Sequence, residues 1–484
     1  MEKNFCGEII MKRKQLVCYV VVMFGICLLP FAGMLWKDSE ESVENRTLAG
    51  TPVLKNEEGW NVDFLADAGA FFEDHFAYRQ EMVTADAKVR GEIFGVSADD
   101  SVIQGTDGCL YYMDSLDDYL GRNVLSDRAV YNVAHTLKMM QDYIEGTGRK
   151  FVFTVAPNKN SLYNENMPYY YSVKENEVSN IDKLQAVLEQ EEVHYVNLHE
   201  LFGKKEEILY HERDSHWNNK GAALAAEALM DALDLEHTSY ENAEYEVRTD
   251  FEGDLDQMLY PNATTLEDEI YYAEPFAYEY VNEVESNFDP EIQTVNGEKT
   301  GSLLMYRDSF GNALLPFMAE EFGEAKFSRG VPYYLDDMFF CNADMVVVER
   351  AERFIPDMAE NPPVMQAPLA LLNYVGAGDE VEQATCETTD EGLYLKFSGI
   401  IDETLLQTDS QIYLRLDGEF TYEAFPMTVT QDGETSDYGY ALYLAQEYLE
   451  GDSGKVELFV ASGDEVKKVL ETEVDFGAGE DLLY

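Results

Sequence analysis

Short apolar runs alternate with amphipathic stretches along the middle of the chain. Residues 151–156 (FVFTVA) form an unbroken apolar run, which is typical of a strand buried on both faces in a parallel sheet. Further strands are predicted at residues 193–198, 302–306 and 345–348. Helical spacing of apolar residues is found between them, at residues 131–146, 181–190, 221–233 and 312–322. This alternation predicts an α/β layer fold with a parallel sheet.

The pattern changes after Asp379, where short strands follow one another without helices between them. These strands are predicted at residues 393–397, 412–416, 440–444 and 456–460. Asp-Gly and Ser-Gly turns separate them, and this spacing favours a β-sandwich over residues 380–484. We expect the linker at residues 376–379, after an α/β domain that covers residues 44–375.

An uncharged, mostly apolar run at residues 15–36 follows the basic cluster of Lys12, Arg13 and Lys14. At about 1.5 Å per residue, a helix over this run reaches across a bilayer core of about 30 Å. The positive-inside rule then predicts a cytoplasmic tail at residues 1–14 and an extracytoplasmic remainder. A cleaved signal peptide is the alternative, although the run is long and lacks a clear small-residue cleavage site. Both interpretations place the bulk of the chain outside the cytoplasm.

Composition excludes several classes of protein. The chain has 34 Lys and Arg against 94 Asp and Glu, and the resulting net charge of −60 repels phosphate backbones. Nucleic acid is therefore not expected as a partner. At 46% hydrophobic residues the chain is globular rather than disordered. The six cysteines show no C-x-x-C spacing and no loop has an EF-hand pattern, so we expect no metal.

A first candidate for chemistry is the segment RDSHWNNKG, which precedes the predicted helix at residues 221–233. Asp214 stands two positions before His216, so its carboxylate can orient the imidazole and stabilise the imidazolium that forms when the ring takes a proton. Trp217 can fix the loop, and Asn218 can cap the helix. The alternative is that Asp214 and Trp217 only shape the entrance to this helix.

A second candidate is Ser309, in the segment YRDSFGN between the predicted strand at residues 302–306 and the following helix. A serine at a strand-to-helix turn exposes its hydroxyl at the carboxyl end of the sheet, where backbone N–H groups can stabilise an oxyanion. Phe310, Gly311 and Arg307 are therefore candidates for oxyanion or substrate binding, as is Trp217. The alternative is that Ser309 merely caps the helix.

A third segment, APNKNSLY, follows the predicted strand at residues 151–156. Asn158 and Lys159 could supply an amide and an ammonium group to the same crevice, or they could belong to a plain polar loop. Ligands of α/β sheets bind outside the carboxyl ends of the strands. Convergence of these segments in one crevice would thus point to a nucleophile, a base and oxyanion donors at one site.

The segments DSHWNNKGA and YRDSFG together resemble those of the AlgX/AlgJ and DHHW group, a family of SGNH-hydrolase-like proteins that O-acetylate exported polysaccharides. The resemblance covers about residues 44–353. It implies that His216 is the catalytic base, that Asp214 orients the His216 ring, and that Ser309 is the nucleophile. His216 precedes Ser309 in the chain, as in the alginate branch of the family. The β-domain lies where AlgX carries a carbohydrate-binding module.

The function that the resemblance implies is extracytoplasmic O-acetylation of a cell-surface or exported polysaccharide through an acyl-serine. The acceptor is then a polysaccharide, and a membrane-bound O-acyltransferase is the implied acetyl donor, since acetyl-CoA is not expected outside the cell. We expect no cofactor. Two alternatives remain: a carbohydrate esterase with the same triad, and a non-catalytic surface protein that binds polysaccharide.

Overall fold

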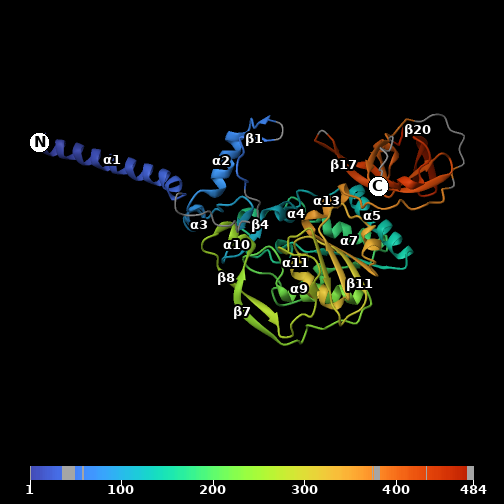
Figure 1. The fold of residues 1–484 in the computed structure, drawn as a ribbon, viewed down its shortest axis with the longest axis horizontal. Helices are drawn as coiled ribbons and strands as arrows, with labels where there is room; N and C mark the ends of the chain where they lie inside the picture. Colours follow the sequence, from blue (N-terminus) through green and yellow to red (C-terminus); the bar gives the residue numbers. More distant parts are fainter. Residues whose placement is uncertain are drawn as a thin grey trace. The chain divides into compact units, whose positions relative to one another are not determined.

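The computed structural model describes residues 2–34, 49–56, 59–372, 374, 382–431 and 433–476 (Figure 1). The chain forms two compact units. The smaller unit contains Met1–Met113, Glu212–Ser215 and Thr249–Asp268, and the larger unit contains Asp114–His211, His216–Arg248 and Glu269–Tyr484. The linker predicted at residues 376–379 lies outside the described residues.

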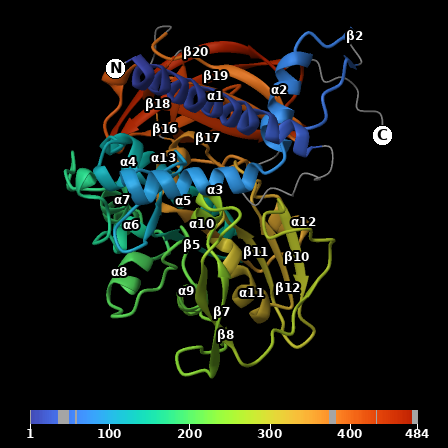
Figure 2. The same ribbon diagram turned by 90° about the vertical axis from the view of Figure 1, so that its left-hand side faces the viewer.

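A seven-stranded sheet forms the centre of the larger unit, and several of its strands can be followed in Figure 2. The order is β6 (Tyr195–Val196), β5 (Lys150–Ala156), β13 (Met345–Ala351), β11 (Ser302–Tyr306), β12 (Glu324–Ser328), β10 (Glu291–Val295) and β9 (Glu279–Tyr280). The first five strands are parallel, whereas β10 pairs antiparallel with both β12 and β9. The prediction of an α/β fold with a parallel sheet is confirmed.

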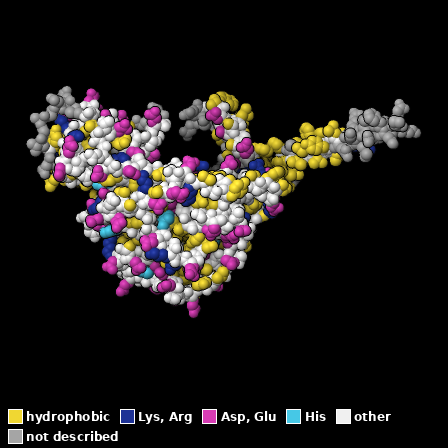
Figure 3. All heavy atoms as spheres, turned by 180° about the vertical axis from the view of Figure 1, so that it is seen from behind, with side chains coloured by type: hydrophobic (Ala, Val, Ile, Leu, Met, Phe, Trp, Pro, Cys, Tyr) yellow, Lys and Arg dark blue, Asp and Glu magenta, His cyan; other side chains and the backbone are white. Residues whose placement is uncertain are grey.

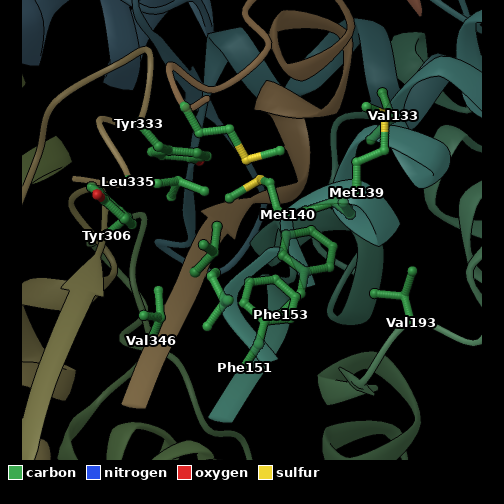
Figure 4. Packing of buried hydrophobic residues seen from close by; sticks show 14 of the residues in the cluster. Val133, Met139, Met140, Phe151, Phe153, Val193, Tyr306, Tyr333, Leu335 and Val346 are labelled. Atoms are coloured by element: carbon green, nitrogen blue, oxygen red, sulfur yellow. The ribbon is translucent and has the colours of Figure 1, made fainter. Parts of the chain in front are cut away.

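Helices cover both faces of this sheet. Figure 3 shows acidic side chains scattered over the visible surface, whereas apolar side chains fill two cores. Alternate residues of β5 divide between them: Phe151 and Phe153 enter one core (Figure 4), and Val152 enters the other. The first core includes α5 (Asp127–Gly146) and α7 (Asn180–Gln190), and the second includes α8 (Leu198–Gly203), α9 (Asn219–Ala232) and α11 (Gly311–Glu321). The result is a three-layer α/β/α arrangement.

The C-terminal part of the larger unit is one curled antiparallel sheet. Its order is β14 (Glu387–Glu391), β15 (Tyr394–Ile400), β18 (Glu434–Ala445), β17 (Phe420–Gln431), β16 (Gln411–Leu416), β19 (Ser453–Ser462) and β20 (Glu465–Asp475). Thr388 Oγ1 in β14 donates to the Asp475 carbonyl in β20 at 2.8 Å, which brings the two edge strands together.

The predicted strands of this part are confirmed, but the two separate sheets of a sandwich are replaced by one continuous sheet. The reason lies in β17, which pairs with β16 over residues 420–424 and with β18 over residues 425–431. A single long strand thereby belongs to both halves of the sheet. A register shift between Met427 and Val429 accompanies the bend.

The smaller unit is mainly helical. It contains α1 (Glu2–Gly33), α2 (Phe64–His75), α3 (Arg79–Val89), α10 (Asp254–Leu259), and the hairpins β1–β2 (Lys55–Asn56, Gly59–Trp60) and β3–β4 (Val102–Gln104, Leu110–Tyr112). Leu255 and Leu259 of α10 pack against Val102 and Leu110 of the second hairpin. This contact holds α10 beside the segment Glu212–Ser215 that leads to His216.

Within the described residues, no helix has both the length and the hydrophobicity that crossing a bilayer requires. Several apolar side chains of α1, among them Leu16, Val17 and Phe24, are exposed. Residues 35–48, which include the end of the predicted anchor, lie outside the described part of the chain. The membrane anchor stays a prediction.

Candidate active site

His216 and Ser309 come from distant segments of the larger unit and meet at its surface. His216 Nε2 lies 2.9 Å from Ser309 Oγ, which is hydrogen-bonding distance. Both side chains are partly exposed, so a substrate can reach them. The structure therefore brings the predicted base and the predicted nucleophile together in the geometry that activates a serine.

The turn that carries Ser309 is held by Asp308, whose carboxylate accepts two backbone N–H groups. One comes from Phe310 at 2.9 Å and the other from Ala351, at the end of β13, at 2.7 Å. The turn is thereby tied to the neighbouring strand. Phe310, and not Ser309, is the N-cap residue of α11, and the Phe310 side chain makes no capping hydrogen bond.

Glycine is required at position 311 because of Arg307. A Cβ at this position would lie 2.6 Å from the Cβ of Arg307, closer than real contacts allow. Arg307 is only 2% exposed, and its guanidinium donates to Asn312 Oδ1 at 2.6 Å and to the Asn287 carbonyl at 3.0 Å. Burial, followed by the charge of Arg329, lowers the pKa of Arg307 to about 10. Arg307 thus braces the turn from within, and its role in substrate binding stays a prediction.

Aromatic rings form a wall behind His216. The ring of Phe310 lies edge-on to His216, with centroids 4.8 Å apart, and edge-on to Trp217 at 5.0 Å. The side chains of Phe310 and Trp217 are buried. The Phe310 N–H donates to Asp308 Oδ1, and the roles of Phe310 and Trp217 in oxyanion or substrate binding stay predictions. Asn218 Oδ1 accepts the Gly221 N–H at 3.0 Å, which confirms the predicted cap of α9.

Asn158 and Lys159 follow β5 as predicted, but both are buried. Asn158 Nδ2 donates to Asp118 Oδ2 at 3.2 Å, and its backbone N–H donates to Glu352 Oε2 at 2.8 Å. Burial, with a contribution from the charge of Glu352, raises the pKa of Asp118 to about 6. Asn158 thus belongs to a buried polar cluster, and the roles of Asn158 and Lys159 in substrate binding stay predictions.

Sequence reasoning did not identify the buried carboxyl groups of this region. Glu352 Oε2 lies 3.0 Å from His199 Nε2, and Glu349 Oε2 accepts the Asp308 N–H at 3.1 Å. Burial, together with the charge of Asp308, raises the pKa of Glu349 well above its usual range. A signal was present, because Glu349 directly follows the predicted buried strand at residues 345–348 and Glu352 stands three positions further on.

Asp214 belongs to the smaller unit and is buried. Its Oδ2 accepts the Asp254 N–H at 2.8 Å, while the Asp254 carboxylate accepts the Ser215 N–H at 2.9 Å and the Ser215 hydroxyl at 2.7 Å. These bonds fix the segment that enters the larger unit at His216. The role of Asp214 as the third member of a triad stays a prediction.

Comparison with known proteins shows which family part of this chain resembles. Residues 102–291 match a family model for an SGNH hydrolase-like domain. More narrowly, that model describes the acetyltransferase AlgX, so the resemblance predicted from the two motifs is confirmed. The matched range contains Asp214 and His216 and ends before Ser309.

Solved structures similar to this chain have low sequence identity to it. PatB1 from Bacillus cereus is 14% identical, with 52% of this chain and 96% of that chain covered and a TM-score of 0.41. A DHHW family protein from Eubacterium siraeum is 16% identical, with coverages of 52% and 90% and a TM-score of 0.38. The O-acetyltransferase domain of AlgJ from Pseudomonas putida is 17% identical, with coverages of 53% and 92% and a TM-score of 0.34. No curated protein matches the chain.

Proposed function

We propose that this chain is an extracytoplasmic O-acetyltransferase that acts on a cell-surface or exported polysaccharide. The observation that carries the proposal is the 2.9 Å contact between His216 Nε2 and Ser309 Oγ. The match of residues 102–291 to an acetyltransferase family supports the choice of acetyl transfer.

The reaction has two halves. In the first, Ser309 Oγ bonds to the carbonyl carbon of an acetyl ester or thioester, and its proton passes through His216 Nε2 to the leaving group. In the second, a sugar hydroxyl gives its proton to His216 and bonds to the same carbon, and Ser309 leaves as the restored hydroxyl. The N-terminus of α11 begins two residues after Ser309, and its dipole favours the negative charge that develops there.

The proposed location of the domain rests on the N-terminal segment. The exposed apolar side chains of α1 support an anchor that holds the domain at the outer face of a membrane. A membrane-bound O-acyltransferase would there supply the acetyl group. The polysaccharide would be acetylated as it leaves the cell.

Replacing the nucleophile tests the proposal. Ser309→Ala should lower acetyl transfer by about 10⁴-fold or more, because the acyl-serine cannot form. The control is Ser172→Ala, which removes an exposed serine hydroxyl that donates to the Tyr169 carbonyl. Both variants should unfold at the wild-type temperature. Unchanged acetyl content of the polymer in the Ser309→Ala strain would refute the proposal.

Replacing Asp214 tests the third member of the triad. Asp214→Asn should lower kcat by about 10³–10⁴-fold, because the amide favours the wrong imidazole tautomer and cannot stabilise the imidazolium. The measurement is acetate release from a nitrophenyl ester. A rate within a factor of about three of wild type would exclude Asp214 from the relay.

The same assay separates transfer from hydrolysis. A transferase should release nitrophenol faster when an oligosaccharide acceptor is added, and the acetyl group should appear on the sugar. An esterase should release free acetate at a rate that the acceptor does not raise.

A further inference from the structure

A cavity of about 690 Å³ opens on the larger unit beside α11. Its lining comes from β7 (Tyr245–Glu252), β8 (Leu266–Tyr272), the segment after β8 and the middle of α11. Five aromatic side chains line it: Tyr245, Tyr271, Tyr272, Phe276 and Phe317. An adjoining cavity of about 340 Å³ shares Tyr272 and Phe276 with it.

The aromatic rings form a fixed platform. Phe317 is edge-on to Tyr272 at 5.9 Å and to Phe276 at 5.4 Å, and the backbone N–H of Ala277 is tied to Glu320 Oε2 at 2.7 Å. Tyr245 and Phe276 are nevertheless 51% and 38% exposed. Rings that are held in place but open to solvent suit a pyranose, whose C–H face packs on an aromatic ring while its hydroxyls point to polar groups at the rim.

The charge of the lining selects among sugars. Glu244, Glu246 and Glu274 face the cavity, against one cation, Arg248. Arg248 is ion-paired with Glu246 and lies over the Tyr271 ring at 4.4 Å. The carboxylates accept hydrogen bonds from sugar hydroxyl or ammonium groups and repel a uronate, as does the net charge of −60.

The cavity is connected to the active site through two helices. Pro316 and Phe317 of α11 line it, and the rise of about 1.5 Å per residue puts Pro316 about 7.5 Å along the helix axis from Gly311, the first residue of α11. Asn219, three residues after His216, also lines it, and Asn219 Nδ2 donates to the Ile270 carbonyl at 2.9 Å. The base, the nucleophile and the cavity therefore share one rigid frame.

We propose that this cavity is an acceptor subsite that binds a neutral or amino-bearing sugar unit and selects against uronates. The role of this cavity in acetyl transfer, which is to hold the sugar that receives the acetyl group, rests on the proposed function. The sugar-binding property itself does not, and can be measured without catalysis.

Binding is tested with the full chain carrying Ser309→Ala, by calorimetry. The probes are chitopentaose (neutral), its de-N-acetylated form (cationic) and pentagalacturonate (anionic). The expected result is binding of a neutral or cationic probe with at least about tenfold preference over the uronate. Equal or tighter binding of the uronate, or binding of none of the probes, would overturn the proposal.

Side-chain variants locate the site. Tyr245→Ala and Phe276→Ala should each weaken the bound probe by about tenfold, whereas Tyr169→Ala, an exposed tyrosine outside the lining, should not. Glu274→Gln should reduce the ratio between the affinity for the neutral or cationic probe and the affinity for the uronate. Unchanged affinity in both aromatic variants would overturn the assignment.

Activity separates this proposal from the function on which it builds. If the Tyr245→Ala and Phe276→Ala variants transfer acetyl groups as fast as the wild type, the proposed acceptor subsite is refuted. The proposed acetyltransferase function would not be affected by that result. If the wild type transfers no acetyl group but its sugar binding still depends on Tyr245 and Phe276, the acetyltransferase function is refuted. The cavity would then still be a sugar-binding site.

Discussion

Asp308 is the residue on which the position of Ser309 depends most directly. Its two carboxylate oxygens accept N–H groups on both sides of the turn, from Phe310 and from Ala351. The Ser-Phe-Gly motif after a predicted strand was enough to predict the strand-to-helix turn on which Ser309 lies. The two hydrogen bonds that Asp308 accepts were not predictable, because Ala351 is brought to Asp308 only by the pairing of β11 with β13.

Removing one of the two hydrogen bonds that the Asp308 carboxylate accepts should displace the Ser309 hydroxyl. Asp308→Asn replaces one acceptor with an amide group that cannot accept, leaving one buried N–H unsatisfied at a cost of about 1–3 kcal/mol. We expect kcat for nitrophenyl acetate to fall by about 10²-fold, because a misplaced nucleophile is costly even when it is present. The control, Asp142→Asn, changes an exposed carboxylate on α5 that pairs with Lys138. Wild-type kcat in Asp308→Asn would contradict a positioning role.

At the scale of elements, α5 is held by a charged histidine. His135 Nδ1 lies 2.8 Å from Glu191 Oε2, and its Nε2 lies 3.0 Å from Glu423 Oε1 in β17. Burial alone would lower the pKa of His135, but the hydrogen bonds to the two glutamates outweigh it and raise the pKa to about 9. Because the ring keeps its proton when folded, it stabilises the fold fully below its unfolded pKa of about 6.5.

This stabilisation should fade as the pH rises through about 9. We expect His135→Gln to lower the melting temperature clearly at pH 6 and by progressively less between pH 7 and pH 10. His194→Gln, which changes a more exposed histidine paired with Glu145, is the control and should lower the melting temperature at pH 6 by much less, because exposed ion pairs contribute little to stability. A His135→Gln deficit that does not shrink with pH would mean that the ring acts by packing alone.

The elements with clear apolar periodicity were predicted closely. The helix predicted at residues 221–233 is α9 (Asn219–Ala232), and the one predicted at 312–322 is α11 (Gly311–Glu321). β10 and β12 were missed, because their sequences mix charged and apolar residues in runs too short for a period to stand out. Pairing across the sheet, rather than local pattern, makes them strands.

At the scale of the whole molecule, the C-terminal sheet shares a core with the α/β part of the larger unit. Tyr394, Phe425 and Tyr443 from this sheet belong to the same buried cluster as Met140 and Phe153. Arg128 of α5 adds polar contacts, since its Nη1 donates to the carbonyls of Gln407, Thr408 and Ser410 at 3.3, 3.0 and 2.7 Å.

Opening this shared core should destabilise the larger unit as one body. Phe425→Ala should cost about 3–5 kcal/mol, the usual range for a buried phenylalanine. Phe420→Ala removes a 54% exposed ring from the same strand, β17, and should cost far less. Calorimetry should show one transition that shifts as a whole. Two separate transitions in Phe425→Ala would show that the parts unfold independently.

The core that Phe425 shares with Met140 and Phe153 has an evolutionary consequence. A C-terminal module that ended in its own polar face could be exchanged between lineages by recombination at the linker. In this protein, a C-terminal sheet taken from another protein would place different apolar side chains against Met140 and Phe153, and the shared core would pack poorly. We therefore expect the two parts to evolve together, through paired substitutions of residues that contact each other in the shared core. Exchange of the whole C-terminal sheet is not expected.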